Sequence, residues 1–237
     1  MERSLANDTV ATRIAHVREK IAKACAAVGR DPSEVTLMAV TKTVDADRIN
    51  EALAAGITHI GENRVQEFLG KRDGLHLDGV QAHLIGHLQT NKVKQIVGKV
   101  DMIQSVDSER VARAIDTASA ALGIVTPVLV EVNIGGEDAK SGIDPDGLEE
   151  LLTQIAQMPH VSVQGLMTVP PILQHSPEKR AIFAKMKKLF IDIRDKNIHN
   201  ISMNVLSMGM SSDYEEAVME GATLVRVGSA IFGERVY

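Results

Sequence analysis

The chain alternates between short apolar runs and longer amphipathic segments along most of its length. Apolar residues first recur with the period of a helix, at Val10, Ile14, Val17, Ile21 and Ala24. This pattern predicts that the first 29 residues form a helix, ended by Gly29. The next segment, VTLMAVTKT (Val35–Thr43), is a continuous run of apolar and β-branched residues, which is typical of a buried parallel strand. Its one charged residue, Lys42, is expected at the C-terminal end of that strand.

The alternation then continues to the C-terminus. Further strands are predicted at 59–63, 82–88, 102–106, 127–133, 161–169, 204–208 and 224–227. Helices are predicted at 45–56, 65–69, 91–97, 108–122 with Ser108 as N-cap, 146–158, 178–196 and 213–220, and a polar loop at 135–142.

Eight strand–helix units imply a parallel sheet, and this chain length matches a (β/α)8 barrel of the α/β class. The alternative is a doubly wound open sheet, which would want a glycine-rich turn after the first strand. VTKTVDAD contains no glycine. We therefore expect one barrel domain over residues 1–237 with an extra N-terminal helix.

Composition narrows the class of protein. The 237 residues are 44% hydrophobic and 24% charged, which is globular, and the formal net charge of -5 without a basic run makes nucleic-acid or anionic-membrane binding unexpected. Aromatic residues make up only 3%, which argues against platforms for stacking bases. No apolar run is long enough for a membrane span, the N-terminus lacks a secretory signal, and Cys25 is the single cysteine, so we expect a cytoplasmic protein.

A barrel carries its site at the C-terminal ends of its strands, and polar residues gather there. They are Lys42, Glu62, Asn63, Arg64, His87, Gln89, Ser105, Asp107, Glu131, Asn133, Thr168, 207–212 and 226–229. Glu62, Asp107 and Glu131 could act as acids or bases, although solvated or hydrogen-bonded roles are the expected ones. His83 and His87 have the spacing of a helical zinc pair, but on a strand they would lie roughly 13 Å apart, so no metal site is expected.

Lys42 is the first candidate for chemistry. A partly buried lysine tends to lose its proton, and a neutral amine attacks carbonyl carbons to form Schiff bases. The bland alternative is a lysine that ends the strand and reaches into solvent. Two small-residue turns, SMGMSSD and RVGSAIFG, follow the seventh and eighth strands, where barrels commonly bind phosphate. They could equally be ordinary turns with glycines for tight geometry.

Barrel closure would bring the first and eighth strands side by side, about 4.8 Å apart. If Leu224, Arg226 and Gly228 face inward, Arg226 lies beside the space above Lys42 and helps to keep its amine neutral. An amine for an aldehyde, a phosphate cradle and an arginine together suit pyridoxal 5′-phosphate (PLP). An arginine facing the pyridine nitrogen cannot accept the ring proton, so the ring would be a weak electron sink.

The stretches AVTKT, HIGENRVQE, HLIGHLQTNK, GLMT, LSMGMSSD and VRVGSAIFG resemble signature segments of the pyridoxal phosphate homeostasis protein family, over residues 10 to the C-terminus. The resemblance implies a barrel like the N-terminal domain of fold-type III enzymes such as alanine racemase, with no C-terminal β domain. It implies that Lys42 is the Schiff-base lysine, that Arg226 faces the pyridine nitrogen and that Asn63 lies near the ring. It also implies that Ser207, Ser211, Gly228 and Ser229 bind the phosphate.

The family implies a role in intracellular vitamin B6 homeostasis, as a PLP carrier or regulator without strong catalytic activity. The opposing tyrosine of the racemases would come from a second domain. The sequence has two tyrosines, Tyr214 and Tyr237, and we do not expect Tyr214 to replace it. The alternatives are a fold-type III amino-acid racemase and a PLP-independent Schiff-base or phosphosugar barrel. We further expect a monomer whose recipients, if any, are PLP-dependent apoenzymes.

Overall fold

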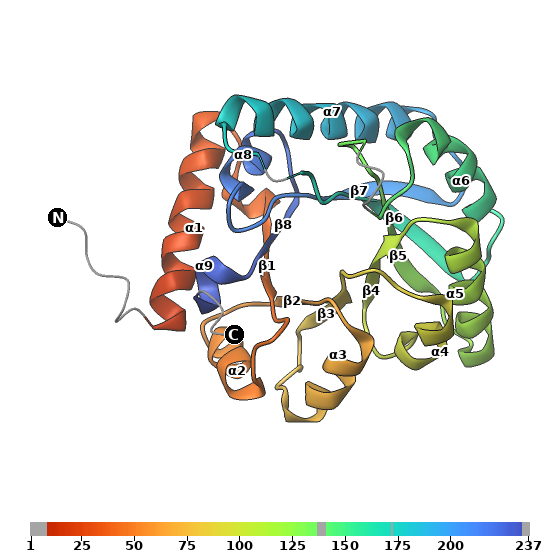
Figure 1. The fold of residues 1–237 in the computed structure, drawn as a ribbon, viewed down its shortest axis with the longest axis horizontal. Coiled ribbons are helices and arrows are strands. Elements are labelled where there is room, and N and C mark those ends of the chain that lie inside the picture. The colour runs from red at the N-terminus through yellow and green to blue at the C-terminus, as the bar shows by residue number, and fades with distance from the viewer. Residues whose placement is uncertain (1–8, 137–140, 172, 234–237) are drawn as a thin grey trace.

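Eight parallel strands form a closed barrel in the order β1 to β8, and helices surround it (Figure 1). The computed structural model describes residues 9–136, 141–171 and 173–233. The strands are β1 (Thr36–Val40), β2 (His59–Glu62), β3 (Gln81–Leu84), β4 (Met102–Val106), β5 (Thr126–Glu131), β6 (Val161–Met167), β7 (Ile201–Ser207) and β8 (Leu224–Val227). The predicted barrel is confirmed, and the open sheet is not formed.

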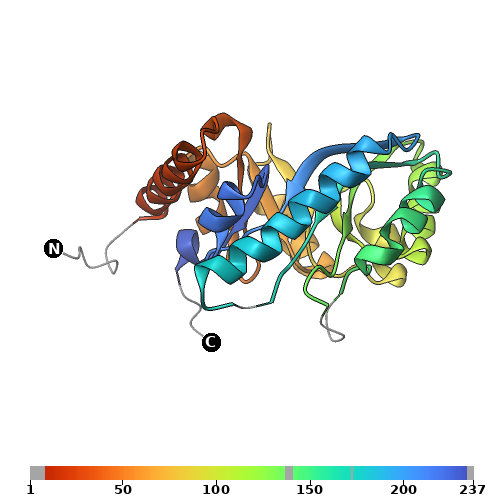
Figure 2. The same cartoon turned by 90° about the horizontal axis from the view of Figure 1, so that it is seen from above.

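The α-helices are α1 (Val10–Ala27), α2 (Ala46–Ala54), α3 (Val65–Lys71), α4 (Val93–Ile96), α5 (Glu109–Leu122), α6 (Leu148–Ile155), α7 (Ser176–Asp195), α8 (Tyr214–Met219) and α9 (Ser229–Phe232). Short 3-10 turns are η2 (Pro32–Glu34), η3 (Arg72–Gly74), η4 (Thr90–Lys92) and η5 (Pro145–Gly147). Figure 2 shows the longest of these helices, α7, lying along the outside of the barrel. No helix among the described residues is long and apolar enough to cross a membrane.

The extra N-terminal helix completes the outer ring. Among the described residues, the element after β8 is the four-residue α9, which covers little of that part of the barrel. α1 packs there, against α2, α8 and α9 (Figure 1). Its buried residues are Val10, Ile14, Val17, Ile21, Ala24 and Cys25, so the predicted apolar stripe is the packed face.

Several predicted boundaries were wrong. The segment 82–88 is not one strand, because β3 ends at Leu84 and the chain turns away at Gly86. His87 therefore lies in a loop, and the strand spacing assumed for His83 and His87 does not apply. No group of three or more histidine, cysteine, aspartate or glutamate side chains that could hold a metal occurs among the described residues.

Other differences concern short helices and their caps. Helix 91–97 is a 3-10 turn followed by the four-residue α4, and α9 was not predicted. Ser108 is the N-cap residue of α5, but its hydroxyl donates to Asp107 Oδ1 instead of accepting from the helix. The loop at 135–142 is described only in part, and Tyr237 lies outside the described residues.

The core has two layers of different character. Between the strands and the helices the packing is apolar, with Phe68, Ile103 and Phe183 fully buried. The barrel interior also contains buried polar and charged side chains, among them His83, Gln104, Ser207 and Arg226. Buried polar groups are costly unless they are hydrogen-bonded, so the interior is where a specific arrangement must be satisfied.

Candidate functional site

A cavity of about 330 Å³ opens at the C-terminal ends of the strands. We call it the mouth cavity, and its size is typical of sites for small molecules. It is lined by Val40, Lys42, Asn63, Ile85, Val169, Met210, Ser211, Ser212, Arg226, Gly228 and Ser229. The lining contains six of the seven site residues expected from the sequence, drawn from both ends of the chain. Ser207 is the exception.

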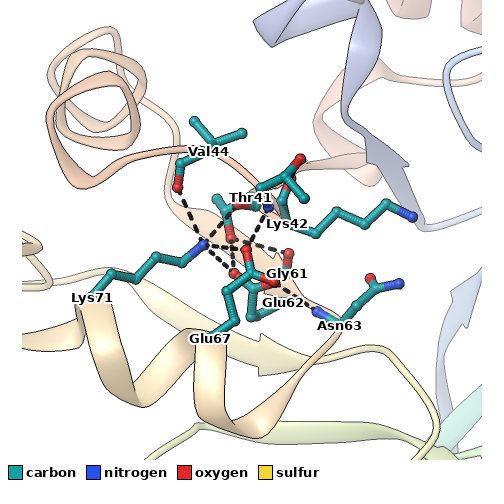
Figure 3. Close-up of polar contacts among 9 residues, drawn as sticks. Thr41, Lys42, Val44, Gly61, Glu62, Asn63, Glu67 and Lys71 are labelled. Atoms are coloured by element: carbon teal, nitrogen blue, oxygen red, sulfur yellow. Dashed lines mark hydrogen bonds and ion pairs between the residues drawn. The ribbon is translucent and has the colours of Figure 1, made fainter. Parts of the chain in front are cut away.

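Lys42 lies in a turn and not in the strand. β1 ends at Val40, and the segment Thr41–Val44, here called the Lys42 turn, closes with a hydrogen bond from Val44 N to Thr41 O. Thr43 has a φ of 62°, in the left-handed region that β-branched residues rarely adopt. The half-buried Lys42 side chain extends from this turn into the mouth cavity (Figure 3).

Arg226 lies inside the barrel. It pairs in register with Met38 of β1, so the first and eighth strands are neighbours as predicted. Its Nη1 donates to Ser207 Oγ at 2.6 Å, and its Nη2 donates to Thr168 O at 2.8 Å. Burial lowers the pKa of Arg226 to about 10, partly opposed by the carboxyl groups of Glu131 and Asp213. The guanidinium therefore remains charged at neutral pH and presents only donors to the cavity.

A hydrogen-bonded series continues from Arg226 across the barrel. Ser207 Oγ donates to Gln104 Oε1 at 2.7 Å, which leaves the Gln104 amide nitrogen to donate to His83 Nδ1 at 2.8 Å. Burial lowers the pKa of His83 to about 3, so its ring is neutral and Nδ1 can accept. Sequence reasoning missed Gln104, and its only signal was a glutamine within the apolar strand MIQSV.

The two small-residue turns meet at the cavity. Ser211 Oγ, from the turn after β7, accepts from Gly228 N at 3.1 Å and Ala230 N at 3.3 Å, at the start of α9. Met210 N donates to Asp213 Oδ1, which fixes the first turn, and burial raises the pKa of that carboxyl group. Backbone N–H groups, serine hydroxyls and a guanidinium form a donor set that suits a phosphate group.

Asn63 is placed by contacts on both sides of its backbone. Its N–H donates to Glu62 Oε1 at 2.9 Å. On the other side Gly86 packs against it so closely that a Cβ at position 86 would collide with the Asn63 carbonyl oxygen. Ser105 Oγ donates to Gly86 O at 2.7 Å and holds this contact together.

Glu62, Glu131 and Asp107 do not line the mouth cavity. Glu62 is buried against Lys71, and burial raises the pKa of Glu62 despite that ammonium. Glu131 accepts from Ser141 Oγ at 2.7 Å, and burial raises its pKa too. Asp107 and His87, 3.5 Å apart, line a larger and more polar cavity of about 690 Å³, which extends to Asp144.

Comparisons with known proteins agree with this geometry. Residues 13–236 match the family of the alanine racemase N-terminal domain. The chain is 43% identical over 225 residues to the pyridoxal phosphate homeostasis protein of Aquifex aeolicus (strain VF5), covering 95% of this chain and 98% of that protein.

Two solved structures are similar over nearly the whole chain. A crystal structure described as that of an unknown protein from Bifidobacterium adolescentis superposes with a TM-score of 0.90 at 36% identity, covering 97% of this chain and 100% of that one. PipY of Synechococcus elongatus PCC7942, solved with PLP bound, superposes with a TM-score of 0.83 at 36% identity, covering 95% of this chain and 100% of that one.

Proposed function

This chain belongs to the pyridoxal phosphate homeostasis protein family, within the wider family of the alanine racemase N-terminal domain, and from that premise we propose that it binds PLP and acts in PLP homeostasis. The observation that carries the proposal is the lining of the mouth cavity. It combines one lysine, one buried arginine and two turns rich in hydrogen-bond donors.

The residues present fit the chemistry of PLP. When bound, PLP supplies an aldehyde, which condenses with a primary amine to give a Schiff base and one molecule of water. Lys42 is the only lysine in the described lining of the mouth cavity and would hold the aldehyde carbon. Arg226 would face the pyridine nitrogen, and Ser211, Gly228 and Ser229 would hold the phosphate, with Asn63 near the ring.

Ser207 takes a different part in this proposal. Its hydroxyl accepts from Arg226 and donates to Gln104. Ser207 would therefore orient the arginine and would not bind the phosphate directly. The backbone N–H groups at the start of α9 are now bonded to Ser211 Oγ. Rotation of the Ser211 side chain would release these N–H groups, which could then donate to a phosphate oxygen.

A role as carrier or regulator, without strong catalytic activity, fits the polarity of the cavity. Arg226 cannot accept the proton of the pyridine ring, which leaves the ring a weak electron sink. The described lining contains no carboxylate, histidine or tyrosine that could move a substrate proton. Tyr214 is buried in α8, where burial raises its pKa to about 12, so it remains a protonated phenol.

The alternative is an amino-acid racemase, and the match to the alanine racemase N-terminal domain is the observation that favours it. It predicts exchange of the Cα proton of L-alanine or L-serine in deuterated water, catalysed by the PLP-loaded protein and lost in Lys42→Ala. Exchange no faster than with free PLP would favour the carrier.

The test of PLP binding is a visible spectrum of the purified protein mixed with PLP, followed by borohydride reduction and peptide mass mapping. We expect a new visible band and a reduced PLP adduct on Lys42. Lys42→Ala should show neither. Absence of the band from the wild-type protein, or an adduct that persists at another residue in Lys42→Ala, would contradict the assignment.

The cellular setting forms part of the same proposal. We place the protein in the cytoplasm as a monomer that passes PLP to apoenzymes, consistent with its net charge of -5 and single cysteine. Sedimentation velocity would check the monomer. Transfer would be checked by the gain of activity when a PLP-dependent apoenzyme is mixed with the loaded protein, compared with the same amount of free PLP.

A further inference from the structure

A second lysine lies directly behind the Lys42 turn (Figure 3). Lys71 is the last residue of α3, and its side chain is only 12% exposed. Its ammonium donates to Thr41 O at 2.8 Å and to Val44 O at 3.3 Å, the first and last residues of the turn. It also pairs with Glu62 Oε2 and, at 3.2 Å, with Glu67 Oε1.

The two carboxylates that hold Lys71 also bind the turn themselves. Glu67 Oε1 accepts from the backbone N–H of Thr43, the residue with the left-handed φ. Glu62 Oε2 accepts from Thr41 Oγ1 at 3.1 Å. Side chains of β2 and α3 therefore bind Thr41, Thr43 and Val44, which are the other three residues of the turn. A threonine in the left-handed region costs roughly 1–2 kcal/mol, so the turn needs such external support.

The two lysines point in different directions from this cluster. The Lys42 side chain leads away from the carboxylates into the mouth cavity, whereas Lys71 points into them (Figure 3). An ammonium has three hydrogens to donate, and the oxygens around Lys71 accept them. A protonated amine has no lone pair with which to attack a carbonyl carbon.

We propose that Lys71, together with Glu62 and Glu67, positions Lys42 for reaction with its aldehyde ligand. This inference rests on the proposed function and extends it to three residues that are not part of the described cavity lining. Lys71 acts through the backbone of the Lys42 turn, so it is a positioning residue. The same contacts explain why one of two neighbouring lysines reacts and the other does not.

The first test removes the buried cation without leaving a buried charge. Lys71→Met alone would strand the Glu62 carboxylate, which is 1% exposed, and could prevent folding. The double variant Lys71→Met/Glu62→Gln replaces the ion pair with side chains of similar size. The matched control is Lys20→Met, which breaks an exposed lysine–glutamate pair of α1 with Glu215.

The readouts are the rate constant of the new visible band after PLP is mixed with the protein, its dependence on pH, and the melting curve without PLP. We expect the double variant to melt cooperatively, to react at least about tenfold more slowly and to show a shifted pH profile. Lys20→Met should match the wild type. A folded double variant with the wild-type rate and pH profile would overturn the positioning role.

The second test keeps the ion pair of Lys71 with Glu62 and changes the two contacts of Glu67, which are those with Thr43 N–H and with the Lys71 ammonium. Glu67→Ala removes the acceptor of Thr43 N–H, whereas Glu67→Gln keeps an oxygen at that place. We expect Glu67→Ala to react several-fold more slowly and Glu67→Gln to recover to within about twofold of the wild type. Equal rates in all three proteins would contradict the proposal even if the double variant does not fold.

These outcomes distinguish a failure of the proposed function from a failure of the positioning role. A wild-type protein that gives no visible band with PLP overturns the proposed function and this inference together. A wild-type protein that reacts on Lys42, with variants that react equally fast, overturns the positioning role alone.

Discussion

His83 ends a series of hydrogen bonds whose direction depends on a neutral imidazole. Arg226 donates to Ser207, Ser207 donates to Gln104, and Gln104 donates to His83. A protonated His83 could not accept the last of these bonds, and the Gln104 amide would face another donor. Because burial lowers the pKa of His83 to about 3, its ring is neutral and accepts this bond. The neutral ring therefore helps to orient Arg226 through Gln104 and Ser207.

This pKa makes His83 a source of acid sensitivity. The folded value lies below the ordinary value of 6.5, so the unfolded chain binds more protons between these limits. The stability from a neutral His83 is fully present above pH 6.5 and is lost as the pH falls toward 3. Between pH 7 and pH 5 the loss should be about 2 kcal/mol.

Urea unfolding at pH 7 and pH 5 checks this, with His83→Gln as the comparison. Glutamine keeps an acceptor for Gln104 and does not titrate. We expect the variant to lose about 2 kcal/mol less than the wild type between the two pH values. The buried acids Glu62, Glu131 and Asp213 are common to both proteins, so their titration should largely cancel. Equal losses would show that His83 does not carry this sensitivity.

At the scale of single residues, the sequence predicted those whose role follows from their position on a strand. Lys42 and Arg226 could be found because they follow or interrupt apolar runs that a parallel barrel aligns. Gln104 and Lys71 could not be found, because their partners come from distant strands and turns. Glu67 and Lys71, spaced i and i+4 on a helix, look like any surface ion pair in the sequence.

At the scale of elements, the segments that follow β2 and β3 contact each other at Gly86. Gly86 allows the chain after β3 to pack on the Asn63 backbone, and any side chain at position 86 would collide with it. Gly86→Ala should push Asn63 out of place, lower the free energy of unfolding by about 1–3 kcal/mol and weaken PLP binding.

Gly70 offers a matched control. It lies within the helix α3, and a Cβ added there meets nothing within 4 Å. Gly70→Ala should raise stability by about 0.5–1 kcal/mol and leave PLP binding unchanged. Urea unfolding and PLP titration of both variants check the pair. A Gly86→Ala protein as stable as the wild type would show that the contact with Asn63 relaxes at little cost.

The element pattern was predictable wherever a strand or helix was long enough to show its period. β4, α5 and β8 agree with the sequence to within a few residues because each shows a sustained apolar pattern. The end of α1 agrees as well, but its start was predicted too early, because Thr9 is the N-cap and the helix begins at Val10. β3 was predicted too long because HLIGHL is apolar enough to continue a strand, whereas the strand ends at Leu84 and the chain then packs on the Asn63 backbone at Gly86. The four-residue α4 and α9 are too short to show a helical period.

At the scale of the whole molecule, the mouth cavity joins the two ends of the chain. Lys42 follows the first strand, whereas Arg226, Gly228 and Ser229 belong to the last strand and its turn. A ligand in this cavity would contact β1, β8 and the turns that follow β1, β7 and β8, together with Asn63, Ile85 and Val169 after β2, β3 and β6. No residue of β4 or β5 belongs to the described lining. Binding energy should therefore be concentrated at the closure of the barrel.

Hydrogen–deuterium exchange with and without PLP tests this distribution. The amides of Met208, Arg226, Gly228 and Ala230 donate the hydrogen bonds that join β7 and β8 and the turns after them, and opening this region would release the ligand. At a PLP concentration 100-fold above its Kd, binding stabilises the closed form by about 2.7 kcal/mol, which is roughly a hundredfold slower exchange for amides that exchange through that opening. Amides of β4 (Met102–Val106) should slow much less if they exchange through a separate local opening. Uniform slowing would instead mean that the barrel opens only as one unit, and Lys42→Ala should lose most of the effect in either case.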